Sequence, residues 1–168
     1  MPSRCFLKTF ITLAVFIALA TCDSTVSAQT HRPFQGSWNW AEFATDKSEL
    51  PPAYQSMELK EVPRFAVDLT IKQKGNKITG SFGIVARYLA RVDEGSFTAT
   101  IKGSTARFKV ESNFGGSATI QLTIRGSKLI WKRLKSTGQM YFPEDLELRK
   151  LKPGEKLPYE ADDEPGLR

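Results

Sequence analysis

Few side chains in this sequence have the types and spacings that acid–base, nucleophilic or metal chemistry requires. His31 is the single histidine among 168 residues and lies in a short polar lead-in. Two adjacent carboxylate pairs, Asp93-Glu94 and Glu144-Asp145, occupy turn-like positions, where acidic side chains are favoured for local hydrogen bonding. The acidic run at residues 160–164 lacks the glycine and the ligand spacing of a calcium loop. The sequence therefore predicts a protein that is not an enzyme, with no catalytic residue, metal site or cofactor.

The N-terminus has the pattern of a secretion signal. Arg4 and Lys8 precede an uncharged stretch at residues 9–22 that is shorter than the roughly 20 apolar residues of a membrane-spanning helix. Val26-Ser27-Ala28 then supplies the small residues that a signal peptidase reads. We predict a signal peptide at residues 1–28, export to the periplasm or the extracellular space, and no transmembrane segment in the mature chain that starts at Gln29.

A lipid anchor is the second interpretation of this segment. Leu19-Ala20-Thr21-Cys22 resembles a bacterial lipobox, in which Cys22 is lipidated, although Thr21 departs from the usual glycine, alanine or serine. Soluble export is the favoured prediction. Since Cys5 and Cys22 are the only cysteines, the mature domain has no disulfide with either outcome.

Apolar and polar residues alternate along most of the mature chain. The clearest run places Phe65, Val67, Leu69 and Ile71 on one face and polar residues on the other. Similar runs, separated by short turns, cover residues 37–43, 78–84, 97–102, 106–111, 118–125 and 129–131, with a last strand at 139–142 or 146–149. Alternation with short connections is typical of antiparallel sheets with one wet face.

This pattern predicts an all-β fold, a single small antiparallel up-and-down barrel of about eight strands within residues 29–150. A two-sheet sandwich is the alternative. Residues 45–63 are predicted to be a long loop with one helical turn near residues 54–60. The proline-rich and acidic residues 151–168 are predicted to be a disordered tail.

The inward face carries large aromatic residues together with small ones such as Gly80 and Ala99. Barrels of eight strands are either just filled by side chains or hold one small ligand, and the sequence leaves both outcomes open. If there is a cavity, its ligand is apolar or amphipathic. Its predicted lining is Phe65, Leu69, Phe82, Phe97, Phe108, Leu122 and Trp131 in the interior, with Tyr88 at the rim beside Arg87 and Arg91.

Positive charge is concentrated in three adjacent predicted strands. Residues 101–135 contain eight basic residues and one acid, Glu111, in a chain of formal charge +6. We predict a basic outer face formed by Lys102, Arg107, Lys109, Arg125 and Lys132. Such a face could bind an anionic component of the cell envelope. A nucleic-acid partner is not predicted, because the chain is exported and no aromatic and basic residues alternate as a stacking platform.

Gly36-Ser37-Trp38 opens the first predicted strand, and this motif ahead of an eight-strand meander resembles the calycin superfamily of lipocalins, fatty-acid-binding proteins and avidins. The resemblance implies that Trp38 closes one end of the barrel with an arginine packed over its ring, which would be Arg149. Trp40 and Ala44 stand where avidins hold biotin through Asn and Ser, so biotin is not the expected ligand.

With the apolar interior, the resemblance implies an exported, non-enzymatic binding protein that holds a small apolar or amphipathic ligand. The alternative is a filled structural barrel that binds an anionic envelope component or a macromolecule through its basic outer face. Neither the ligand nor the oligomeric state follows from the sequence.

Overall fold

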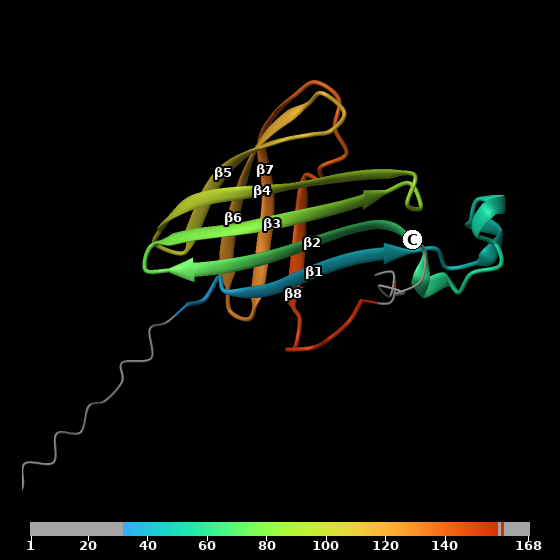
Figure 1. Cartoon of the computed structure of the whole chain (residues 1–168), viewed down its shortest axis with the longest axis horizontal. Coiled ribbons are helices and arrows are strands. Elements are labelled where there is room, and N and C mark those ends of the chain that lie inside the picture. The colour runs from blue at the N-terminus through green and yellow to red at the C-terminus, as the bar shows by residue number, and fades with distance from the viewer. Residues whose placement is uncertain (1–31, 158, 160–168) are drawn as a thin grey trace, which may run out of the picture.

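Eight antiparallel strands close into one barrel in the computed structural model, which describes residues 32–157 and 159 (Figure 1). The strands are β1 (Gly36–Phe43), β2 (Pro63–Lys74), β3 (Lys77–Ala86), β4 (Arg91–Lys102), β5 (Thr105–Glu111), β6 (Ser117–Arg125), β7 (Lys128–Thr137) and β8 (Asp145–Lys150). Each strand pairs with the next along the chain, and β8 pairs with β1 to close the sheet. The prediction of an all-β, up-and-down barrel is confirmed.

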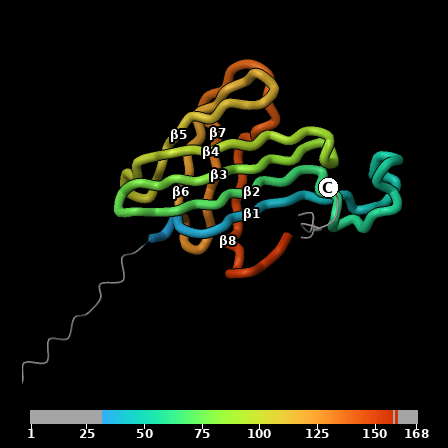
Figure 2. Tube along the Cα trace, in the orientation of Figure 1, coloured from blue at the N-terminus to red at the C-terminus, as the bar shows by residue number. Residues whose placement is uncertain are grey.

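The barrel is unevenly paired around its circumference. β2 and β3 pair over ten residues, whereas β4 and β5 pair only at Ile101–Ala106 and Lys102–Thr105. Beyond their turn β4 and β5 diverge, so β2–β4 cross over β5–β7 at a steep angle in the trace (Figure 2). The interior side chains of the two halves therefore face one another across the barrel.

The two ends of the barrel differ in the connections that they carry. The turn end has the short β2–β3, β4–β5 and β6–β7 turns, at residues 75–76, 103–104 and 126–127. The loop end has the connections at residues 44–62, 87–90, 112–116 and 138–144. Most residues in irregular connections are therefore at the loop end. Their side chains do not follow the inward and outward alternation of the strands.

The β1–β2 connection is a folded excursion with its own apolar cluster. It contains three short 3-10 helices, η1 (Lys47–Glu49), η2 (Pro52–Tyr54) and η3 (Leu59–Glu61). Ala44, Leu50 and Val62 are buried together, and Tyr88 and Leu89 from the β3–β4 turn pack against them. The long-loop prediction is correct in outline, with three short helical turns where one was expected.

The start of the predicted tail is docked on the barrel, which corrects the prediction of disorder for residues 151–157 and 159. The amide of Leu151 donates to the carbonyl oxygen of Ser37 at 2.8 Å, and Leu157 is only 3% exposed. Tyr159 places its hydroxyl group 3.1 Å from Oδ1 of Asp68. One apolar and one aromatic residue in a polar segment are enough to hold it against β1.

Several predictions concern residues outside the described part of the chain. They include the signal peptide at residues 1–28, the lipidation of Cys22, His31 and the acidic run at 160–164. Within residues 32–157 and 159, no helix has the length and apolar character to cross a membrane.

Candidate functional site

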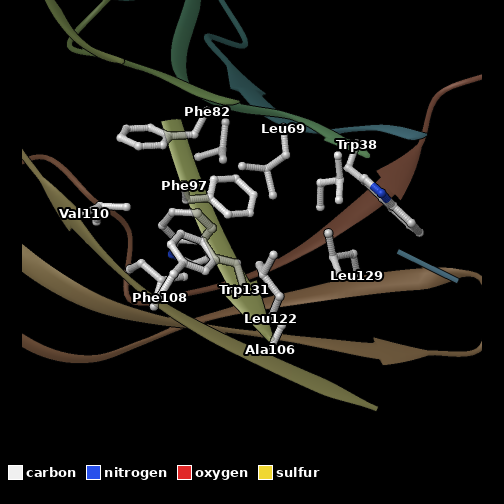
Figure 3. Packing of buried hydrophobic residues seen from close by; sticks show 14 of the residues in the cluster. Trp38, Leu69, Phe82, Phe97, Ala106, Phe108, Val110, Leu122, Leu129 and Trp131 are labelled. Atoms are coloured by element: carbon white, nitrogen blue, oxygen red, sulfur yellow. The ribbon is translucent and has the colours of Figure 1, made fainter. Parts of the chain in front are cut away.

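The interior residues predicted to line a ligand cavity pack against one another instead. Leu69, Phe82, Phe97, Phe108, Leu122 and Trp131 are all buried in one core cluster, and the partly buried Phe65 packs against it (Figure 3). The Phe97 and Phe108 rings are stacked with centroids 4.0 Å apart, and Trp131 meets Phe108 edge-on at 6.3 Å. These ring contacts occupy the middle of the barrel.

Gly80, one of the small inward residues, lies under the ring of Phe97, so it does not leave the space that the sequence suggested; Gly95, two residues before Phe97, has a similar ring beside it but stays exposed. A Cβ atom at Gly80 would lie 2.8 Å from Cζ of Phe97, and one at Gly95 would lie 2.8 Å from Cζ of Phe82. Each phenylalanine covers a glycine on an adjacent strand, an arrangement known to stabilise glycine in sheets. Each glycine and the ring beside it pack together as one unit of the sheet.

Trp38 closes the turn end, but the cation over its ring is Lys150, which corrects the assignment of Arg149. Nζ of Lys150 is 5.2 Å from the ring centroid, whereas Arg149 forms an ion pair of 2.6 Å with Glu155. Side chains alternate along a strand, so Lys150 lies on the same side of β8 as the buried Leu148, and Arg149 lies on the other. The Trp38 indole also donates to the carbonyl oxygen of Phe34 at 2.9 Å.

Lys150 also explains the glycine at the start of β1. Gly36 has a φ of 129°, and a Cβ atom there would lie 2.6 Å from Cε of Lys150. The positive φ favours glycine at this position, and the missing side chain leaves room for the end of the lysine stem. Gly36, Trp38 and Lys150 form one closure of the turn end.

Asp93 is not a turn residue, as the sequence suggested, but a buried carboxylate on the inner side of β4. It is 1% exposed and accepts hydrogen bonds from Oγ of Ser112 (2.7 Å) and the backbone amide of Asn113 (2.6 Å). Oγ of Ser112 in turn accepts from the amide of Phe114 at 3.1 Å. Asp93 therefore fixes the β5–β6 loop across the gap where β4 and β5 have separated.

The structure places Arg107, Lys109 and Lys135 on the outward side of β5 and β7, on either side of β6. Arg107 is opposite Gln121 and donates to its Oε1 at 2.7 Å, and Lys109 is opposite Thr119, which pairs with Lys135. Among the described residues, none of these three cations has an acidic partner within 4.0 Å.

The remaining residues of the predicted face lie around this row. Lys102 and Arg125 are exposed at the ends of β4 and β6, beside the tight turns. Lys132 lies 4.0 Å from Asp145 on β8, and Lys128 pairs with Glu147 at 3.1 Å. The acids of β8 thus neutralise one side of the face, and its unpaired part centres on β5 and β6.

A second charged group, at the loop end, consists of Arg87, Arg91, Phe114 and Tyr141, which come from three different connections. Cζ of Arg87 is 5.3 Å from the Tyr141 ring centroid, and Cζ of Arg91 is 5.7 Å from that of Phe114. The two rings meet edge-to-face at 4.9 Å. The sequence placed both arginines at the rim, but nothing in its periodicity pointed to Phe114 or Tyr141.

Tyr88 does not join this rim group. Its side chain packs with Leu50 and Val62 in the cluster under the β1–β2 connection. Arg87, the preceding residue, faces Tyr141 on the other side of the same turn. Tyr88 therefore anchors the turn, and the ligand contact predicted for it is not supported.

Within the described residues, no three His, Cys, Asp or Glu side chains are grouped closely enough to hold a metal ion. No protein-family model, curated protein or solved structure matches this chain. The class that the structure defines is a small closed β-barrel with a packed interior, a basic outer face and an arginine–aromatic group at its loop end.

Proposed function

We propose that this protein is an exported, non-enzymatic binding protein whose filled barrel presents its basic outer face to an anionic lipid surface of the cell envelope. The observation that carries the proposal is the filling of the interior. The Phe97 ring lies against Gly80, and the Phe82 ring lies against Gly95. Because side chains fill the interior in this way, a binding partner would contact the charged outer surface of the barrel.

The outer face has the chemistry for this partner. Arg107 and Lys109 on β5 and Lys135 on β7 flank β6, and these three cations have no acidic partner among the described residues. Each lysine or arginine near an anionic leaflet contributes about 1 kcal/mol to binding. Three such groups supply about 3 kcal/mol, and Lys102 and Arg125 bring the total to about 5 kcal/mol, which corresponds to weak, reversible adsorption.

Membership of the calycin superfamily is also a proposal. It is supported by the closure formed by Gly36, Trp38 and Lys150 and by the eight-strand order. A calycin-like barrel with a filled interior would keep the end closure and use its surface, since function follows from the site rather than from the fold.

Sedimentation with vesicles tests the proposed function. The mature chain is mixed with phosphatidylcholine vesicles that contain or lack phosphatidylglycerol, and the bound fraction is measured against salt. We expect binding only with phosphatidylglycerol, and a steep loss of affinity as salt screens the charges. The double variant Arg107→Gln/Lys109→Gln should bind about 30-fold more weakly, from about 2 kcal/mol lost.

The matched control is Lys72→Gln/Lys74→Gln, which removes the same charge from exposed positions on β2. It should weaken binding by no more than a few-fold. An equal loss in both double variants would contradict a localised face. Binding to neutral vesicles without salt dependence would also contradict it. A small molecule released on unfolding the protein from its own host, detected by native mass spectrometry, would restore the interior-ligand alternative.

A further inference from the structure

The β3–β4 turn at the loop end holds three successive non-glycine residues in a strained conformation. Arg87, Tyr88 and Leu89 have φ values of 53°, 57° and 67°, in the left-handed region that residues with a Cβ atom rarely adopt. The turn is tied down by Tyr88 and Leu89, which pack into the cluster under the β1–β2 connection. Strained backbone of this kind persists where the surroundings fix it and is concentrated at functional sites.

The conformation of this turn directs the side chain of Arg87 toward Tyr141. Its guanidinium group lies over the Tyr141 ring, while Arg91, at the start of β4, lies over Phe114. Since Phe114 and Tyr141 touch, the two cations are held on one continuous aromatic platform. Neither arginine has an ion pair with a described acid, and both act on Tyr141, so two positive groups lie beside this ring without an acidic partner among the described residues.

Arginine over an aromatic ring keeps its N–H edge available. The cation–π contact uses the face of the guanidinium plane, and the five N–H groups lie around its edge. Of the two, Arg91 uses part of its edge for the carbonyl oxygen of Ala90, at 3.1 Å, and for the hydroxyl group of Tyr141. The remaining edges match oxyanions, which guanidinium groups bind with paired hydrogen bonds.

We propose that Arg87, Arg91 and the hydroxyl group of Tyr141 form a binding site for a phosphate group. Two guanidinium edges and one hydroxyl group supply donors from three side chains, which suits the several oxygens of a terminal phosphate better than the two of a carboxylate. This inference goes beyond the proposed function, because its residues are not those of the basic outer face.

The environment of Tyr141 supports a donor role. Hydrogen bonds from Arg91 and Gln139, together with the positive charges of both arginines, hold the pKa of its phenol below the ordinary value. A more acidic phenol is a stronger hydrogen-bond donor to an anion. A bound phosphate would offset the arginine charges, so it should raise the pKa of Tyr141 toward its ordinary value.

Isothermal titration with inorganic phosphate and with glycerol 1-phosphate tests the site in the mature chain. Arg87→Gln and Arg91→Gln should each weaken binding about tenfold, and Tyr141→Phe about threefold. Arg64→Gln, an exposed arginine paired with Glu42 at 3.7 Å, is the matched control and should leave the affinity unchanged. In ultraviolet titration, phosphate should raise the phenol pKa in the wild type, and Tyr141→Phe should abolish that shift.

Vesicles with phosphatidic acid, which exposes a phosphate monoester, distinguish a lipid source from a soluble one. Binding of both soluble phosphates supports a free ligand. Binding to phosphatidic acid alone, lost in Arg87→Gln, supports a lipid headgroup at the same site. Equal affinity for acetate and phosphate, or no effect of Arg87→Gln and Arg91→Gln on any probe, would overturn the proposal. Arg107→Gln/Lys109→Gln should leave soluble phosphate binding intact, so this site and the outer face can fail separately.

Discussion

Replacing Phe97 with alanine tests whether the barrel is filled by its own side chains. Phe97 is buried, stacks on Phe108 at a centroid distance of 4.0 Å, and covers Gly80. Truncating a buried phenylalanine costs about 3–5 kcal/mol, since the transfer free energy of the ring is lost and a cavity remains. For a domain of this size, that loss lowers the melting temperature by about 10–20 °C.

The assay combines unfolding with a small apolar probe. Urea and thermal unfolding of wild type and Phe97→Ala are followed by circular dichroism, with and without benzene. An apolar cavity of ring size stays dry and binds such a molecule. We therefore expect benzene to raise the melting temperature of Phe97→Ala and to leave that of the wild type unchanged.

Leu134→Ala is the control, because Leu134 is 38% exposed on β7. It should change stability by no more than about 0.5 kcal/mol. A cost below about 1 kcal/mol for Phe97→Ala, together with stabilisation of the wild type by benzene, would refute the reasoning. The interior would then contain open space, and the predicted ligand cavity would be the better description.

Three further substitutions test the packing, the end closure and the loop clamp. Gly80→Ala should destabilise by about 3 kcal/mol, because its methyl group would clash with the backbone carbonyl oxygen of Thr70 and lie 2.8 Å from Cζ of Phe97. Gly83→Ala on the same strand meets nothing within 4 Å and should be neutral or slightly stabilising in urea unfolding. Lys150→Met should cost about 0.5–1 kcal/mol in thermal unfolding through the lost cation–π contact with Trp38, and Lys150→Ala should cost more because the stem is also lost; equal costs would argue against stem packing. Asp93→Ala should cost about 2–3 kcal/mol by leaving the buried hydroxyl group of Ser112 and the part-buried amide of Asn113 without their acceptor. It should also speed amide exchange in the β5–β6 loop, while unchanged exchange would show that the loop is held by other contacts.

The sequence predicted the strands well because one face of the sheet is dry. Phe65, Val67, Leu69 and Ile71 alternate with polar residues, and that period of two fixes both the strand and its inner side. From β2 to β8 the order of the strands follows from the short connections between them, and closing the sheet to remove its edges leaves β1 between β2 and β8. The all-β class and the up-and-down barrel were therefore accessible from pattern alone.

Two errors arose where the same parity rule was not applied. Asp93 has the parity of Phe97 and Ala99, which are buried on β4, and Lys150 has the parity of the buried Leu148 on β8. Extending the alternation by two steps from Phe97 would have placed the carboxylate inside, and extending it by one step from Leu148 would have placed the lysine on the side of Trp38. In each case the sequence contained the information.

The loop end was beyond such rules. Phe114 and Tyr141 lie in connections without periodicity, and their contact with each other depends on how far β5 to β7 reach past the barrel. Whether Gly80 and Gly95 leave a cavity was equally undetermined. Composition gives the volume of the rings but not the rotamers that place Phe97 and Phe82 over the two glycines.

Two sides of the barrel's outer surface differ in what they present to a partner. This difference would orient the protein on a bound surface. Over β1, Nδ2 of Asn39 donates to Oδ1 of Asp68 at 2.7 Å, and Tyr159 closes over both, so this side is covered by the chain itself. On the side formed by β5 to β7, β5 carries Lys109 and continues into the loop that holds Phe114, and β7 carries Lys135 and continues into the segment that holds Tyr141. The basic strands thus end in the loops that form the aromatic platform. A surface rich in phosphate could meet both regions at once, with the strands supplying long-range attraction and the two arginines supplying the contact.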